Sequence, residues 1–234
     1  MVEVFPFRAF HFDSRKVGDL SAVVTQPYDK IDASLQETYY QRHDRNIVRV
    51  IRRRPADEAD PYAAAAEEFR RWIADGSIAR DLKPAIYVYH QIFTHGGERR
   101  VRKGFTALLK LEEFGKSNGV LPHEETHSGP KADRFRLLSA THTHFGQIFL
   151  LFSDTAHRLA ALLDSLCEGP PVLEAKDDFG ETHKVWQVTD PAVIRSVQRE
   201  MKAREVIIAD GHHRYETALN FKGAMVKAGA KPSG

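Results

Sequence analysis

One stretch near the end of the chain constrains the fold more than any other. The apolar run 206–209 predicts a buried strand, and Asp210 and Gly211 follow it before a segment with helical spacing begins. Gly211 has no Cβ, so a ligand can approach the backbone there. The first turn of the next helix offers N–H groups at the positive end of the helix dipole, and Arg214 adds a planar group that can hold phosphate through two hydrogen bonds. This strand–glycine–helix junction predicts an anion site with phosphate as the ligand.

A purely structural interpretation of the junction is also open. In it, Asp210 is an ordinary helix cap and Arg214 an ordinary surface residue. That interpretation leaves two adjacent histidines, His212 and His213, crowded at one helix start with no packing reason. We therefore favour the functional interpretation.

Length and composition limit the class of protein. The chain has 234 residues, with 34 Lys and Arg against 32 Asp and Glu, so net charge gives no reason to expect nucleic-acid binding. The sole cysteine, Cys167, excludes an internal disulfide framework and suits a reducing cytoplasm. The N-terminus does not resemble a signal peptide, and we find no apolar run long enough for a membrane span. We expect a cytoplasmic protein with no membrane partner; its oligomeric state is not predicted.

The hydrophobic pattern mixes strand and helix segments and predicts a single α+β domain over residues 1–234, with mixed sheets and flanking helices. Expected strands are 4–12, 47–51, 86–94, 99–111, 147–152, 172–177, 182–188 and 206–209. Expected helices are 32–42, 61–76, 131–142, 154–167, a segment starting at 191, and 212 to about 227. No later segment could cover the last strand and helix. We therefore expect this chain to be the N-terminal part of a longer protein.

The run His123-Glu-Glu-Thr-His127 fits the H-E-x-x-H pattern of zinc proteases. That chemistry needs both histidines on one face of a continuous helix, with Glu124 as the base. Pro122 and Pro130 flank the run and restrict any helix to about a turn and a half. Zinc-dependent hydrolysis through His123, Glu124 and His127 therefore remains an alternative, with the third ligand to come from His142, His144, His212 or His213.

The same stretch also fits a polar ligand-binding loop. Lys131 and Arg134 fall in the first turn of the helix predicted after it, where positive charge opposes the helix dipole. A bound anion would explain both cations. Glu124 and Lys131 are the strongest candidates for ligand contact, although a solvated loop with a basic helix face is an equal alternative.

Five short motifs together carry a resemblance to a known family. They are Gln26-Pro-Tyr-Asp29, Lys103-Gly-Phe105, Pro122-His-Glu-x-Thr126, Pro130-Lys-x-Asp-Arg134 and Asp210-Gly-His-His-Arg-Tyr-Glu-Thr-Ala218. In this order they resemble the domain-of-unknown-function family 1015 across nearly the whole chain. Members are usually longer, which agrees with the expected missing C-terminal part. The chain departs from the family pattern at residues 144–147, where an Asn-Ser-Pro run is more usual.

More remotely, the Asp210–Tyr215 run resembles the phosphate-binding motif of the ParB/sulfiredoxin superfamily. The resemblance implies a ParB/sulfiredoxin-like nucleotide-binding core with a large insertion. His212 stands where sulfiredoxins have their nucleophilic cysteine, so repair of sulfinic acids by that route is excluded. The superfamily also includes ADP-dependent free-serine kinases, whose similar motif implies a small-molecule phosphotransferase.

The resulting hypothesis is a protein that binds ATP or ADP and phosphorylates a small hydroxylated molecule. Gly211, His213 and Arg214 would hold phosphates, with Lys131 and Arg134 neutralising charge. Asp210 or Glu124 would accept the hydroxyl proton, with His212 also assigned to the catalytic group. Mg²⁺ is expected as a cofactor, and it leaves little sequence trace because most of its ligands are waters and phosphate oxygens. The alternative from a different class is a non-catalytic ParB-like nucleotide-sensing or scaffold module.

Overall fold

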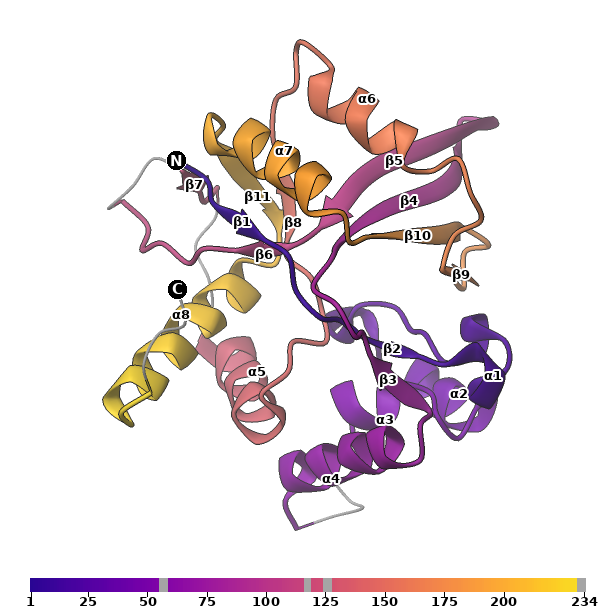
Figure 1. Ribbon diagram of the computed structural model, residues 1–234. Helices are drawn as coiled ribbons and strands as arrows, with labels where there is room; N and C mark the ends of the chain where they lie inside the picture. Colours follow the sequence, from indigo (N-terminus) through magenta and orange to yellow (C-terminus); the bar gives the residue numbers. More distant parts are fainter. Residues whose placement is uncertain (55–58, 116–118, 124–127, 231–234) are drawn as a thin grey trace.

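The computed structural model describes residues 1–54, 59–115, 119–123 and 128–230. Its largest sheet is antiparallel with strand order β5-β4-β10-β9 (Figure 1). The strands are β4 (Ile86–His95), β5 (Glu98–Thr106), β9 (Leu173–Lys176) and β10 (Thr182–Val188). In the register of this sheet, Tyr89 of β4 lies between Gly104 of β5 and Val185 of β10.

A second sheet has the order β7-β11-β8 and carries the junction singled out by the sequence. Its central strand, β11 (Val206–Asp210), runs parallel to β7 (Val120–Leu121) and antiparallel to β8 (Phe149–Leu151). Two further strand pairs join β1 (Val4–Phe5) to β6 (Leu108–Leu109) and β2 (Phe10–Phe12) to β3 (Ile78–Arg80).

The helices flank these sheets. They are α1 (Ser14–Val17), α2 (Ala33–Arg42), α3 (Val48–Ile51), α4 (Pro61–Ala74), α5 (Ser128–Thr141), α6 (Arg158–Ser165), α7 (Pro191–Lys202) and α8 (His212–Lys227), with 3-10 turns at Leu20–Ala22 and Tyr28–Lys30. Two of them begin as expected from their N-caps: Asp60 before α4 and Asp190 before α7 accept backbone N–H groups, and proline follows each. Helix α5 packs between α8 and α4 (Figure 1).

The main hydrophobic core lies between the two sheets and helices α6 and α7. Val88 of β4, Ile208 of β11 and Leu159 of α6 are fully buried in it. A separate core in the N-terminal part surrounds Trp72 of α4. The β4 face that is turned away from the main core carries Tyr89 and Gln91, because side chains alternate along a strand.

The predicted α+β class with mixed sheets is confirmed, but the local predictions are wrong in three respects. The predicted strand 47–51 is helix α3 (Val48–Ile51), with Ile47 at its N-cap. The buried Asn46 directs this: its side chain accepts the Val48 N–H at 3.0 Å and donates to the Ala22 carbonyl at 2.8 Å, which fixes a helical start. The predicted strands 4–12 and 99–111 are each broken in two. The pieces β1 and β2, and likewise β5 and β6, pair with different partners. Strand β11 is buried on one face only, and Ile207 is 46% exposed.

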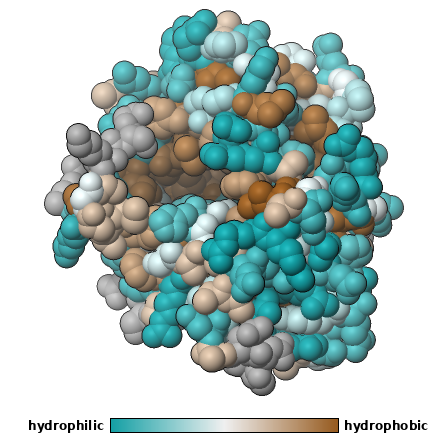
Figure 2. All heavy atoms as spheres, turned by 60° about the horizontal axis from the view of Figure 1, so that its bottom comes forward, coloured by the Kyte–Doolittle hydropathy of each residue, from teal (hydrophilic) through white to brown (hydrophobic). Residues whose placement is uncertain are grey.

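One side of the molecule is hollowed. Figure 2 shows apolar side chains gathered in a depression with polar side chains around it. Across the ranges that the structure describes, no helix combines the length and apolar character needed to cross a bilayer.

Candidate functional site

The junction between β11 and α8 has the geometry that the sequence predicts. Gly211 adopts φ +94° and ψ 29°, a left-handed conformation that favours glycine, and its carbonyl accepts the Tyr215 N–H at 3.0 Å to start the helix. Asp210, at the end of β11, is 64% exposed at its side chain. A solvent-facing carboxylate therefore stands beside the positive end of a helix 16 residues long.

Arg214 folds back over this junction. Its Nη2 donates to Asp210 Oδ2, and its side chain is only 17% exposed. A Cβ at Gly211 would lie 2.8 Å from Arg214 Nε, and one at Gly146 would lie 3.1 Å from its Nη1. The side chain of Arg214 thus lies against two glycines, Gly211 and Gly146. The guanidinium is placed at the helix start as expected, but it already has a carboxylate partner, which sequence reasoning did not anticipate.

His212 is 1% exposed and lies inside the protein. Its Nε2 accepts the backbone N–H of His123 at 3.2 Å, and the two rings meet edge to face with centroids 4.6 Å apart. His123 Nδ1 lies 2.5 Å from the Ile208 carbonyl oxygen, which can only accept, so this nitrogen carries the proton. His212 connects the segment after β7 to the start of α8, so it has the packing role that the sequence analysis did not find for it. Its neighbour His213 is half-buried, and its carbonyl accepts the Thr217 hydroxyl at 2.6 Å.

Glu124 and His127 lie outside the described residues, together with the positions between them. The zinc motif and the proposed base Glu124 are therefore not placed here. Of that motif only His123 is described.

Helix α5 begins at Ser128 and not at Lys131 as predicted, so Arg134 lies in its second turn and the argument from the helix dipole does not apply to it. The two cations lie in separate ion pairs. Lys131 Nζ donates to Glu216 Oε2 at 2.6 Å and so bridges α5 to α8. Arg134 Nε donates to Asp133 Oδ2 at 2.7 Å, and its Nη2 donates to the Ile51 carbonyl at 2.9 Å. Arg134 is thus fixed against the N-terminal part of the chain.

Tyr28 brings the sequence motifs into one neighbourhood. The guanidinium carbon of Arg134 lies 4.1 Å from the centroid of the Tyr28 ring, within the range of a cation–π contact. Burial raises the pKa of the Tyr28 phenol, and the charges of Arg134 and Arg214 oppose that rise. The motifs at 26–29, 130–134 and 210–214 therefore share one electrostatic environment, although they are far apart in the sequence.

Phe149 is a neighbour of the junction that sequence reasoning missed. It pairs with Asp210 in the register of β8 and β11, is 40% exposed, and lies 5.4 Å from the guanidinium carbon of Arg102. The pairing of β8 with β11 is the signal that locates it, and this pairing is not visible in local patterns.

Two surface cavities lie elsewhere. One of about 480 Å³ is lined by residues of α6 and α7 with their flanking loops, including Arg158 and Arg204. The other, of about 320 Å³, is lined by arginines and acidic residues around α3 and α4. Neither is lined by Asp210, Gly211 or Arg214.

Comparison with known proteins gives one match. No curated protein and no solved structure matches the chain. A family model described as "Protein of unknown function (DUF1015)" matches residues 4–233. This match includes every motif on which the resemblance rests and nearly all of the fold. The chain belongs to the DUF1015 family.

Proposed function

We propose that the β11–α8 junction binds the phosphate groups of a purine nucleotide, ATP or ADP, and that the protein transfers a phosphoryl group to a small hydroxylated molecule. The observation that carries the proposal is the placement of Arg214 against the bare backbone of Gly211 at the start of a long helix. In this proposal, sheet β7-β11-β8 and α8 form the ParB/sulfiredoxin-like core, and the rest of the chain is the insertion.

We propose that Arg214 exchanges its partner Asp210 for a phosphate group when the nucleotide binds. Arg214, itself largely shielded from solvent, is paired with the exposed carboxylate of Asp210. A phosphate group would give the guanidinium two charge-assisted hydrogen bonds in place of the one to Asp210. The amides after Gly211 then complete the anion site, with His213 among them.

Two cations of α5 belong to the same proposed site, although each already has a carboxylate partner. Lys131 is about a quarter exposed beside Glu216, and Arg134 lies against Tyr28. We assign both to neutralising charge on the phosphates.

Phe149 offers an exposed aromatic surface next to Asp210, which suits the flat face of a purine base.

We assign catalysis to the carboxylate of Asp210, which Arg214 releases when it binds phosphate. Once Arg214 turns to phosphate, Asp210 can accept the proton of the acceptor hydroxyl. Glu124 remains a second candidate for that role, and the buried His212 is assigned to holding the junction in place. An exposed carboxylate also suits Mg²⁺, which would neutralise phosphate charge when bound.

Calorimetry with ATP and ADP, with and without Mg²⁺, tests the proposal. Arg214→Ala should abolish binding, whereas Asp210→Asn should keep binding and remove turnover. Arg158→Ala is a matched control, because Arg158 is a helical arginine paired with Glu200 at a different place in the fold. No nucleotide binding by the wild type at millimolar concentrations contradicts the proposal. Binding without turnover, together with nucleotide-dependent dimerisation or partner capture, favours the ParB-like sensing module instead.

A further inference from the structure

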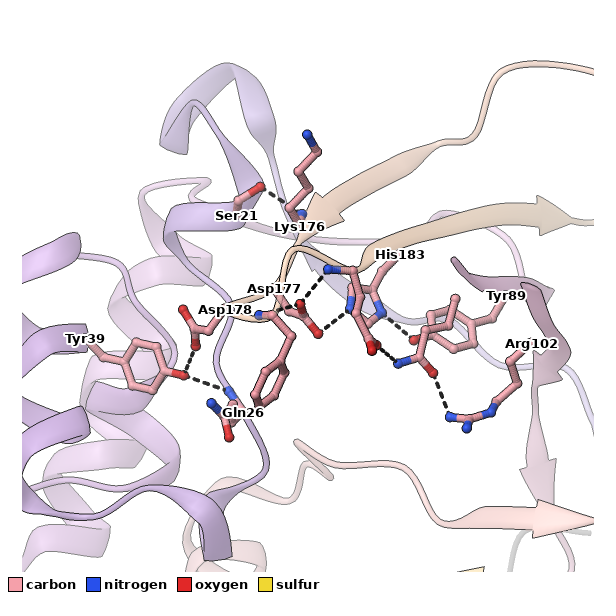
Figure 3. A network of polar contacts seen from close by, with 12 residues as sticks. Ser21, Gln26, Tyr39, Tyr89, Arg102, Lys176, Asp177, Asp178 and His183 are labelled. Carbon is pink, nitrogen blue, oxygen red and sulfur yellow. Dashed lines mark hydrogen bonds and ion pairs between the residues drawn. The ribbon is translucent and has the colours of Figure 1, made fainter. Parts of the chain in front are cut away.

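A second polar cluster lies at the turn between β9 and β10 (Figure 3). Asp177, Glu181 and His183 each offer one ligand atom, and these atoms all lie within 4.8 Å of one another. His183 Nε2 lies 3.1 Å from Asp177 Oδ2. In a tetrahedral site with bonds of about 2.1 Å, two ligand atoms lie about 3.4 Å apart. The imidazole and the first carboxylate, which are hydrogen-bonded here, thus lie within about 0.3 Å of the separation of two ligands on one ion.

We propose that Asp177, Glu181 and His183 bind a divalent transition-metal ion. Two carboxylate oxygens and one imidazole nitrogen suit Zn²⁺ or Mn²⁺ better than Ca²⁺ or Mg²⁺, which prefer oxygen ligands alone. Three protein ligands leave at least one coordination position for water.

The backbone holds Asp177 in place for this role. Its Oδ1 accepts the N–H groups of Phe179 and Glu181, each at 2.9 Å, which fixes the turn. Its other oxygen, Oδ2, is the one that faces His183. The turn therefore uses one carboxylate oxygen and presents the other to the cluster.

Tyr89 orients the histidine from the other side. Its hydroxyl lies 2.5 Å from His183 Nδ1. Without metal, the phenol donates to Nδ1 while Nε2–H donates to Asp177. With metal on Nε2, the proton moves to Nδ1 and is donated to the phenol oxygen, the arrangement typical of metal-bound histidines.

Further polar contacts orient Glu181. Gln91 Nε2 donates to Glu181 Oε2, and Arg102 Nη1 donates to Gln91 Oε1 at 2.8 Å. The carboxylates of Asp177 and Glu181 lie around a single imidazole. A divalent ion would neutralise their negative charge, which the hydrogen bonds to them offset only in part. The side chains of His183 and Asp177 are 25% and 20% exposed, which leaves a path for an ion from solvent.

Zinc titration of tag-free protein, first stripped with a chelator, tests this site without nucleotide. The wild type should bind one equivalent with a Kd in the micromolar range or below. His183→Gln and Asp177→Asn should each weaken binding by about 100-fold, and Tyr89→Phe by about 10-fold. Asparagine keeps an oxygen acceptor for the turn, and circular dichroism with a thermal melt checks that each variant is folded.

Two controls separate this site from other effects. His90→Gln changes a histidine on the opposite face of β4, near Cys167, and should leave zinc binding unchanged. Arg214→Ala should also bind zinc normally, so failure of the nucleotide proposal leaves this one standing. The inference is overturned if the wild type takes up no zinc at 100-fold excess, or if His183→Gln and Asp177→Asn bind zinc like the wild type.

Discussion

Replacing Gly211 by alanine tests the geometry of the junction directly. Gly211 has φ +94°, a conformation that costs an L-residue about 1–2 kcal/mol. The new Cβ would lie 2.8 Å from Arg214 Nε and 2.9 Å from its Nη2, so the guanidinium must move away. For a chain of this size, 1 kcal/mol lowers the Tm by about 2–4 °C. We therefore expect a loss of about 2–8 °C in Tm, together with displacement of Arg214.

A glycine at the other end of the same helix provides the matched control. Gly229 has φ +87°, and a Cβ there meets nothing within 4 Å. Gly229→Ala should therefore cost a similar amount of stability without touching Arg214. Urea and thermal unfolding of both variants should give similar losses in the free energy of unfolding. Calorimetry with ATP and ADP should distinguish the two variants. Gly211→Ala should bind nucleotide about 10- to 100-fold more weakly than Gly229→Ala, because it loses a charged hydrogen bond to phosphate.

The comparison has a clear failing outcome. If Gly211→Ala binds nucleotide as tightly as Gly229→Ala does, the approach of a phosphate to the Gly211 backbone is not part of the site. If neither the wild type nor the control binds nucleotide, the whole assignment of the junction fails. A Gly211→Ala protein as stable as the wild type would instead refute the strain argument.

Two further predictions concern the frame around the site. Tyr215→Phe should lower the free energy of unfolding, measured by urea titration, by about 1–3 kcal/mol. The reason is that the buried hydroxyl donates to the Glu112 carbonyl at 2.8 Å and accepts the Glu112 N–H at 3.0 Å. An unchanged free energy of unfolding would contradict this prediction. Burial acts to raise the pKa of Asp154, but the Ala160 N–H and Arg204 lower it below the ordinary value of 3.8. A lowered carboxylate pKa stabilises the fold above the ordinary value and loses that effect as the pH falls. Asp154→Asn should therefore be less stable than the wild type at pH 7, and unfolding measured below pH 3.8 should show the difference shrinking.

Local signals were enough to predict many of the elements. The sequence places a strand at 206–209 and a helix from His212 to about Lys227, and the structure has β11 and α8 there. The caps before α4 and α7 and the hairpin at 95–98 are also where the sequence puts them. Each of these depends on nearby residues: an N-cap, a turn glycine, or an uninterrupted period.

Local signals failed where distant contacts decide. The β-branched run 47–51 is typical of a strand, but Asn46 bonds to Ala22 and Val48 and starts a helix instead. Distant contacts also decide the geometry of the candidate site. Arg214 was predicted at the helix start, whereas its packing against Gly146 depends on a loop more than sixty residues earlier in the chain. The proposed ligands Asp177, Glu181 and His183 lie within seven residues of one another in the sequence, but the contact of His183 with Tyr89 spans 94 positions and no local pattern reveals it.

The Gln26–Asp29 segment relates the two proposed sites. On one side, Tyr28 lies under Arg134 and feels the charge of Arg214. On the other side, the Gln26 N–H donates to the Tyr39 hydroxyl at 3.1 Å, and that hydroxyl donates to Asp178, the neighbour of the proposed metal ligand Asp177 (Figure 3). A turn of four residues therefore contacts the surroundings of both sites. Energetic coupling is carried by contiguous polar and packed contacts, so we expect any coupling between an ion at β9–β10 and a phosphate at β11–α8 to involve this turn.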